Sequence, residues 1–243
     1  MKKGIQQLLN SFGYRISKLS APASGEDPFT AMQSLLIEIK EPIIFDVGAH
    51  HGHVSRHFRS LFPASTVYSF EPFQDSFEQL KANTASDPGI KVFNFGLGDR
   101  NGTQSFNSNS SSATNSLLAT NELGALTWGS GLLETQAVVQ AEFKTLDSVL
   151  EAMRIPRIDI LKLDVQGAES LVMAGALSAC RTGIIGLVYS EIIVQPTYRG
   201  QKRFDESLAA FYENGFDLYN IYNMHYTAEG RLCQVDATFT KQV

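Results

Sequence analysis

The sequence predicts an α/β fold built on a mostly parallel sheet, and three observations support this prediction. Short apolar runs alternate with amphipathic helical patterns along most of the chain, which is typical of parallel strands buried on both faces. Several of these runs end at glycine or carboxylate residues, at the positions where open α/β sheets bind their ligands. Hydrophobic residues make up 43% of the 243 residues, which is enough for a buried core in a single domain.

The first 28 residues differ from the rest of the chain. Apolar residues recur at helical spacing and predict an amphipathic helix, at Ile5, Leu8, Leu9 and Phe12. Turn-forming residues 20–28 predict a linker. We expect the helix to pack on the domain or to form a homodimer contact, and binding to a membrane surface is the alternative. Residues 29–243 are expected to form the domain.

From Pro42 onward, strand and helix patterns alternate. The expected strands are 43–47, 66–70, 90–95, 158–163, 184–190, 217–222 and 232–240. The expected helices are 54–61, 75–82, 146–153, 168–176 and 204–213. Because only a short loop separates the last two strands, we expect them to form an antiparallel hairpin at the edge of the sheet.

The middle of the chain has a different composition. The pair Asn101-Gly102 predicts a hairpin turn. The run of small polar residues at 107–116 is expected to build no core and to act as a connector or as a flap beside a site. We place this flap at about residues 103–135.

Charge and cysteine content exclude several classes of protein. The net charge of −5 disfavours nucleic acid as a partner, because phosphate binding needs clustered Lys and Arg. Cys180 and Cys233 have no metal-binding spacing and are too few for a disulfide framework, which favours a cytoplasmic protein. No apolar run approaches the roughly 18 residues that span a membrane.

The glycine-rich segment after the first expected strand predicts a ligand loop. Asp46 precedes Gly48 and Gly52, which lie four residues apart. This spacing lacks the GxGxxG pattern that binds a diphosphate. A carboxylate before the glycines instead suits the ammonium group of a cofactor that carries an amino acid.

Two further strand ends suggest an adenosine. Glu71 lies 19 residues after Gly52, where an acidic side chain accepts hydrogen bonds from ribose hydroxyls. The loop from Gly96 to Asp99 offers glycines beside an adenine and a carboxylate for its exocyclic amine. A plain strand end and a β-turn are the structural alternatives.

Charged residues interrupt the expected strand at 158–163 and its continuation. Lys162 and Asp164 fall where burial of charge is costly unless it is paired or functional. Glu191 ends the next strand, so it and Asp164 could hold a divalent cation or share acid and base roles. Glu169 could instead stabilise the first turn of the following helix.

Four histidines cluster near the glycines: His50, His51, His53 and His57. The last two have a helical i, i+4 spacing, but the Glu of zinc proteases is missing. We therefore expect one of these histidines to position a cofactor or act as a base, and His51 is the candidate base.

The motifs FDVGAHHG, SFEP, FNFGLGD, LKLDVQGAE and VDATF, in this order over residues 43–240, resemble the FkbM family of S-adenosylmethionine (SAM)-dependent methyltransferases. The resemblance implies a Rossmann-like class I methyltransferase fold, with a seven-stranded sheet whose last strand is antiparallel and with helices on both faces. It also implies methyl transfer to oxygen on sugars, glycans or secondary metabolites, with S-adenosylhomocysteine (SAH) as the product.

The resemblance assigns roles residue by residue. The expected cofactor-binding residues are Asp46, Gly48, Ala49, His50, Gly52, Glu71, Pro72, Gly96, Leu97, Gly98, Asp99 and Asp164. The expected catalytic residues are Asp164, Glu191 and His51. The expected acceptor-binding residues are Gln166 and Glu169 of the matched motif; independently of the resemblance, they also include Asn115, Ser116 and Trp128 of the flap and Tyr198, whose flat ring suits a sugar face.

Two positions depart from the family pattern. His50 replaces the usual Asn. Gln166 replaces a frequent Glu, and this loss of an acidic group weakens the case for Mg²⁺ at Asp164 and Glu191. We expect no metal there. The alternatives are an N-methyltransferase, a nicotinamide-dependent oxidoreductase and a non-catalytic cofactor-binding subunit.

Overall fold

The computed structural model of the protein describes residues 27–129 and 131–242. The amphipathic helix expected near the N-terminus lies outside the described residues. The homodimer contact assigned to it therefore stays a prediction.

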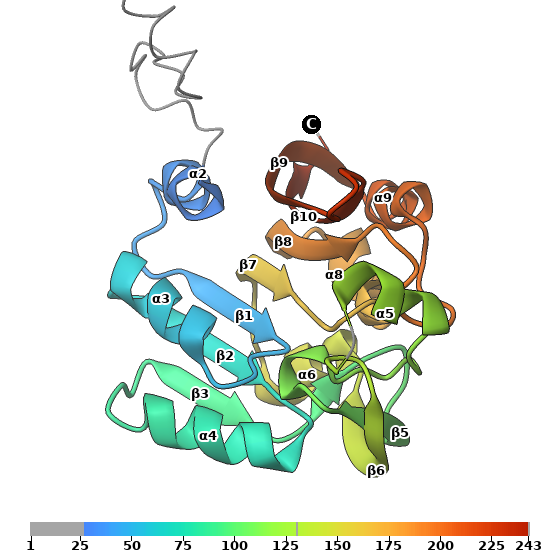
Figure 1. Ribbon diagram of the computed structural model, residues 1–243. Coiled ribbons are helices and arrows are strands. Elements are labelled where there is room, and N and C mark those ends of the chain that lie inside the picture. Colours follow the sequence, from blue (N-terminus) through green and yellow to red (C-terminus); the bar gives the residue numbers. More distant parts are fainter. Residues whose placement is uncertain (1–26, 130, 243) are drawn as a thin grey trace, which may run out of the picture.

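A seven-stranded sheet forms the centre of the domain (Figure 1). Its strands are β1 (Ile43–Val47), β2 (Thr66–Phe70), β3 (Ile90–Phe93), β7 (Ile158–Leu163), β8 (Ile185–Ile193), β9 (Phe216–Tyr226) and β10 (Leu232–Lys241). Their order is β3-β2-β1-β7-β8-β10-β9. The first five are parallel to one another, and β10 pairs antiparallel with both β8 and β9. The predicted sheet and its C-terminal hairpin are confirmed.

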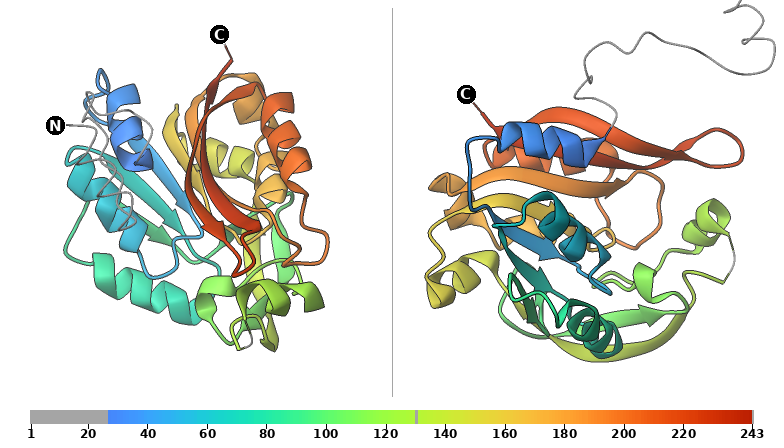
Figure 2. Two further views of the ribbon diagram at one scale, coloured as in Figure 1. Left: turned by 45° about the horizontal axis from the view of Figure 1, so that its top comes forward. Right: turned by 90° about the vertical axis from the view of Figure 1, so that its left-hand side faces the viewer.

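Helices cover both faces of this sheet (Figure 2). One face carries α2 (Pro28–Leu35), α3 (His53–Leu61) and α4 (Gln74–Thr84). The other carries α6 (Leu146–Met153), α7 (Glu169–Ala174), α8 (Leu177–Arg181) and α9 (Phe204–Glu213). The helix expected at 168–176 is thus α7, which ends earlier and is followed by α8. None of the helices in the described part of the chain is long and apolar enough to cross a membrane.

Helix α2 was not predicted, although its first residues carry a start signal. The side chain of Asp27 accepts hydrogen bonds from the backbone N–H groups of Phe29 and Thr30, and Pro28 occupies the first turn. A capping carboxylate followed by proline is a typical helix start. Ala31 and Met32 are fully buried, and Met32 packs with Phe58 of α3 in the core between α2, α3 and the sheet.

A second, smaller sheet was also missed. It contains β4 (Gly96–Leu97), β6 (Thr135–Lys144) and β5 (Gly102–Asn109), in that order, and β5 and β6 are antiparallel. The short helices η1 (Ser112–Thr114) and α5 (Glu122–Trp128) lie between β5 and β6 in the chain. The region expected to be a connector or flap therefore holds regular structure, beside the carboxyl ends of the parallel strands (Figure 1).

The polar run at 107–116 belongs to none of the apolar core clusters in the described part of the chain, but four of its ten residues are buried: Asn107, Asn109, Asn115 and Ser116. Asn115 accepts a hydrogen bond from the backbone N–H of Asn109 (2.7 Å), and the side chain of Asn109 donates to the carbonyl of Thr114 (2.6 Å). Asn107 donates to the carbonyl of Ser116. Burial of polar side chains is tolerated here because they pair with the backbone of the same segment.

Candidate active site

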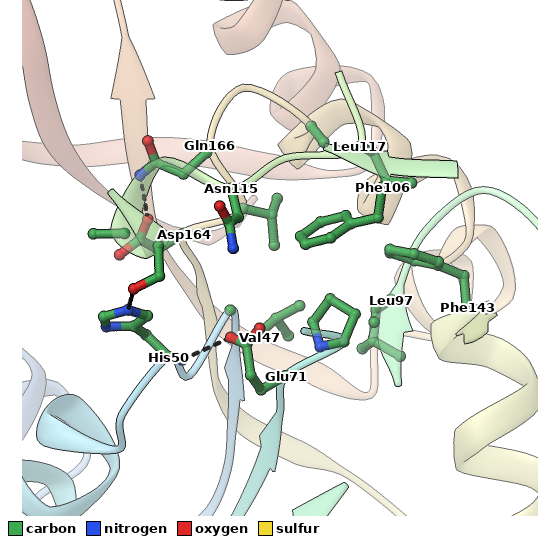
Figure 3. A pocket seen from close by; sticks show the side chains of 17 residues that line it. Val47, His50, Glu71, Leu97, Phe106, Asn115, Leu117, Phe143, Asp164 and Gln166 are labelled. Atoms are coloured by element: carbon green, nitrogen blue, oxygen red, sulfur yellow. Dashed lines mark hydrogen bonds between the residues drawn. The ribbon is translucent and has the colours of Figure 1, made fainter. Parts of the chain in front are cut away.

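A pocket opens at the carboxyl ends of β1, β2 and β7, next to the second sheet (Figure 3). In the sheet order, β1 lies between β2 and β7, so the connections that leave β1 and β7 diverge at this point. Such a switch point is where open α/β sheets bind ligands. The pocket is lined by the loop after β1, by Glu71 and Pro72 after β2, by residues 164–166 and Ala168 after β7 and by side chains of the second sheet.

The glycine loop after β1 is shaped by Gly48. Its φ is +76°, and a Cβ atom added there would lie 1.9 Å from the backbone oxygen of Asp164. Only glycine fits such a position, because the left-handed region and the close approach both exclude a side chain. Gly48 and Ala49 donate backbone hydrogen bonds to the carbonyl of Phe70, at 3.1 and 3.0 Å. Gly52 lies instead against Leu80 of α4 and does not line the pocket.

A buried ion pair supports this loop from below. The ammonium nitrogen of Lys162 lies 2.8 Å from Oδ1 of Asp46, 3.6 Å from Oδ2 of Asp164 and 2.9 Å from the carbonyl oxygen of Gly48. Asp46 and Lys162 are register partners on adjacent strands, and Asp46 is fully buried. Burial lowers the pKa of Lys162, but the charges of Asp46 and Asp164 together outweigh this effect. The pKa of Lys162 therefore lies above its ordinary value. Asp46, expected to contact the cofactor, thus holds Lys162 beneath the loop.

Glu71 lines the middle of the pocket and is 6% exposed. Its two carboxylate oxygens accept hydrogen bonds from the backbone N–H groups of His50 (2.9 Å) and Phe73 (3.0 Å). Burial raises the pKa of Glu71 to about 7, although these two hydrogen bonds lower it. The carboxylate is therefore close to its titration point at neutral pH.

His50 lines the pocket, whereas His51 does not. The His50 Nε2 atom lies 2.8 Å from the hydroxyl oxygen of Ser112. Burial, followed by the neighbouring His51, lowers the pKa of His50 to about 4, so its ring is neutral at physiological pH. The two imidazole rings stack with centroids 3.6 Å apart. His51, the expected base, therefore does not contact this pocket directly.

The opposite end of the pocket is apolar. Leu97, Phe106 and Phe143 of the second sheet gather there with Leu117, which lies between β5 and α5 in the chain (Figure 3). The absence of a side chain at Gly96 makes room for the ring of Phe143, because a Cβ atom would lie 2.2 Å from it. Of the expected adenine loop, Gly96 and Leu97 line the pocket. Gly98 and Asp99 do not: Gly98 pairs with the backbone of Lys144, and Asp99 pairs with Arg100.

Asn115, expected to contact the acceptor, faces this first pocket. It is 8% exposed, and its amide oxygen accepts the hydrogen bond from Asn109. Its amide nitrogen has no hydrogen-bond partner and points into the pocket (Figure 3). A buried donor without a partner is costly, so Asn115 is prepared for a ligand that carries a hydrogen-bond acceptor.

At the polar end, one amide joins two carboxylates. The side-chain nitrogen of Gln166 donates to Oδ1 of Asp164 (2.9 Å) and to Oε1 of Glu191 (2.8 Å). Gln234 donates to the other oxygen of Glu191. Glu191 lies behind Gln166 and does not line the pocket, and burial and then the charge of Asp164 raise its pKa well above the ordinary value. Among the described residues, no group of three or more His, Cys, Asp or Glu side chains is placed to hold a metal ion.

Two expected acceptor residues shape the turn that carries Gln166. The carboxylate of Glu169 accepts hydrogen bonds from the backbone N–H groups of Val165 (3.1 Å) and Gly167 (3.2 Å). Ser116 donates from its hydroxyl to the carbonyl of Gln166 (2.8 Å). Neither side chain lines the pocket, so both act through the turn and hold Gln166 at its φ of +56°.

Three other expected acceptor residues line a second pocket. Trp128, Gln166 and Tyr198 face it, and it shares Ala113 and Gln166 with the first pocket. The indole N–H of Trp128 donates to the hydroxyl of Thr197 at 2.8 Å. The hydroxyl of Tyr198 lies 3.1 Å from the side-chain oxygen of Gln166. Gln166 therefore forms the wall between the two pockets.

The strand order with an antiparallel β10, and a pocket with a polar and an apolar end at the carboxyl edge, define a class I methyltransferase fold. The model of the methyltransferase FkbM domain matches residues 46–218. The chain therefore belongs to the FkbM methyltransferase family, as the sequence motifs predicted.

The chain is similar to two relatives with assigned names, and it shares its fold with a solved structure. The chain is 27% identical to the 2-O-methyltransferase NoeI of Sinorhizobium fredii, over 81% of this chain and 80% of that protein. It is also 27% identical to the hexuronic acid methyltransferase AglP of Haloferax volcanii, over 61% of this chain and 56% of that protein. The N-terminal domain of EvdMO1, solved in the presence of SAH and D-fucose, shares the fold with a TM-score of 0.50 and 9% identity, over 99% of this chain and 97% of that one.

Proposed function

We propose that the protein transfers a methyl group from SAM to a hydroxyl oxygen of a sugar. The observation that carries this proposal is the order of groups along the first pocket. A polar end at Asp164 is followed by the carboxylate of Glu71 and then by an apolar end at Phe106 and Phe143. SAM has the same order of parts: an amino acid, a ribose and an adenine.

The residues present fit this cofactor. Glu71 would accept hydrogen bonds from the ribose hydroxyls, and the rings of Phe106 and Phe143 would contact the adenine. The free N–H of Asn115 would donate to an acceptor atom of the cofactor. Gly48 keeps the loop free of a side chain, so the backbone can approach the cofactor closely. When bound, SAM supplies an electrophilic methyl group on a sulfonium.

Asp164 is the proposed proton acceptor for the attacking hydroxyl. Its carboxylate lines the first pocket beside Gln166, where the second pocket begins. Lys162 and Gln166 hold it from two sides, at 3.6 and 2.9 Å. Such positioning supplies much of the rate of a displacement reaction, and a placed base adds to it.

The choice of an oxygen acceptor rests on the relatives. NoeI is named a 2-O-methyltransferase and AglP a hexuronic acid methyltransferase. A nitrogen acceptor is the second candidate. A Mg²⁺ ion shared by Asp164 and Glu191 is not part of this proposal, because the amide nitrogen of Gln166 already lies between the two carboxylates.

The proposal is tested by calorimetric titration with SAM and SAH, followed by transfer of labelled methyl groups to a panel of glycosides. We expect binding of both cofactor forms and a labelled product that resists alkali, as a methyl ether does. An alkali-labile product would identify a carboxylate ester, and a labelled amine would establish nitrogen as the acceptor. Folded protein that binds NAD and neither SAM nor SAH would refute the proposal.

A further inference from the structure

The second pocket has the position of an acceptor subsite. Methyl transfer requires the acceptor to contact the cofactor, so the two binding sites must adjoin. The second pocket shares Ala113 and Gln166 with the first. Its cavity volume of about 180 Å³ is comparable with the 140 Å³ of the first pocket.

Among the residues that the structure describes, no charged side chain lines this pocket. One wall is apolar and consists of Trp128, Leu132, Leu133 and Ile193. The polar side chains that line the pocket are all neutral: Thr114, Gln166, Thr197, Tyr198 and Gln234. A pocket that combines apolar walls with a few fixed polar groups orients an uncharged ligand by its hydroxyls.

The charges around the pocket are unfavourable for an anion. Asp164 lines the adjoining cofactor pocket, and Glu191 lies directly behind Gln166. Lys162 is buried and already paired with two carboxylates. Arg199 follows Tyr198 in the chain, but it is exposed, lies near Glu122 and does not line this pocket. Within residues 27–129 and 131–242, an anionic acceptor would therefore meet acidic groups without a cation that lines the pocket to balance it.

Trp128 supplies an aromatic surface in a fixed orientation. Its indole N–H is bound to Thr197, so its ring is held in place at the pocket wall. A flat ring suits the face of a sugar that carries mainly C–H groups, because such a contact removes apolar surface from water. Trp128 is also the single tryptophan of the chain.

We propose that the second pocket is the acceptor subsite and that it selects an uncharged sugar ring with an apolar face against Trp128, excluding uronates and sugar phosphates. This inference rests on the proposed function and narrows its substrate class. It differs from the acceptor that the name of AglP indicates, because a hexuronic acid is an anion.

The test measures the fluorescence of Trp128 in the SAH-saturated protein. The three probes are methyl β-D-fucopyranoside, methyl β-D-galactopyranoside and methyl β-D-galactopyranosiduronate. They differ only in the group attached to C5. These groups are a methyl, a hydroxymethyl and a carboxylate. We expect a saturable change with the fucoside and the galactoside, and half-saturation by the uronate at a concentration at least about tenfold higher.

A charge substitution makes the test specific to this pocket. Leu132 lies at the pocket and is 44% exposed, so Leu132→Arg adds a cation at an accessible position. This variant should improve uronate binding by about tenfold relative to the fucoside. The control Leu126→Arg adds the same charge on α5, at a residue that is 82% exposed and does not line the pocket, and should leave the preference unchanged.

Calorimetry with SAH distinguishes failure of the proposed function from failure of the acceptor-subsite proposal. Absence of SAH binding refutes the proposed function. Normal SAH binding together with equal or tighter binding of the uronate overturns the subsite proposal alone. The same holds if none of the three glycosides changes the emission of Trp128.

Discussion

Glu71 offers a test in which stability and cofactor binding should change in opposite directions. Its pKa is raised from 4.5 to about 7 because the carboxylate is buried. This difference means that the ionised side chain costs the folded protein about 3 kcal/mol above pH 7. The cost begins as the pH rises through the unfolded pKa of 4.5, and it is complete above the folded pKa of about 7.

Glu71→Gln removes this charge and keeps the shape of the side chain. The single side-chain oxygen of glutamine replaces two carboxylate oxygens that accept hydrogen bonds from the backbone N–H groups of His50 and Phe73. One of these hydrogen bonds, worth about 1 kcal/mol, is therefore lost. The variant should therefore be more stable than the wild type by about 1–2 kcal/mol near pH 8. The variant should lose this advantage as the pH falls, and it should be the less stable protein near pH 5. Between pH 8 and pH 5, the difference in the free energy of unfolding should change by about 2–3 kcal/mol.

Binding of SAH should respond in the other direction. Loss of charge-assisted hydrogen bonds to the ribose should raise the Kd of Glu71→Gln by about tenfold or more. Wild-type affinity should increase as the pH rises through 7, whereas the affinity of the variant should depend less on pH. Denaturant unfolding and calorimetry at several pH values measure both quantities, with Asp99→Asn as a carboxylate control outside the pocket. A stability difference that does not vary with pH would refute the reasoning.

Three further predictions concern the loop, the base and the metal. Gly48→Ala should lower the free energy of unfolding by at least about 2 kcal/mol more than Gly200→Ala, because both have positive φ but only Gly48 meets a backbone atom; equal losses in thermal unfolding would contradict the close approach. Asp164→Asn should lower kcat by about a hundredfold or more, with a smaller effect on SAH affinity, and an unchanged kcat would exclude Asp164 as the base. EDTA should leave turnover unchanged, because the amide of Gln166 occupies the space between Asp164 and Glu191; inhibition that Mg²⁺ reverses would contradict this.

The elements of the main sheet could be predicted closely from the sequence. The bounds of β1, β2, β7, α6 and α9 equal those expected. These strands are short apolar runs bounded by turns, and α6 and α9 have a clear helical period. In such segments, local pattern and tertiary packing favour the same structure.

The second sheet was missed because its strands are polar on one side and lie beside a Ser- and Asn-rich segment. A signal was nevertheless present in β6, where apolar residues alternate at Ala137, Val139, Ala141 and Phe143. This period of two predicts a half-buried strand. The omission mattered for the candidate site, because Phe106 and Phe143 of this sheet form the apolar end of the first pocket.

The candidate site was predicted in part. Strand ends placed Gly48, Glu71 and Asp164 together, as the structure does. The partnership of Asp46 with Lys162 could not be predicted, because it depends on the register between β1 and β7. The same limit applies to Glu191, whose separation from the pocket by Gln166 follows from the path of one turn.

The segment from Ser112 to Leu117 has a thermodynamic consequence. Ser112 and Asn115 line the first pocket, Thr114 lines the second, and Ala113 lines both. If SAM and a sugar occupy the two pockets as proposed, filling either pocket would order residues that the other ligand also contacts. The second ligand then loses less conformational entropy on binding. By linkage, the factor by which a bound sugar lowers the Kd of SAH must equal the factor by which bound SAH lowers the Kd of the sugar. A short run of serine and asparagine residues would in this way make the two affinities of the enzyme interdependent.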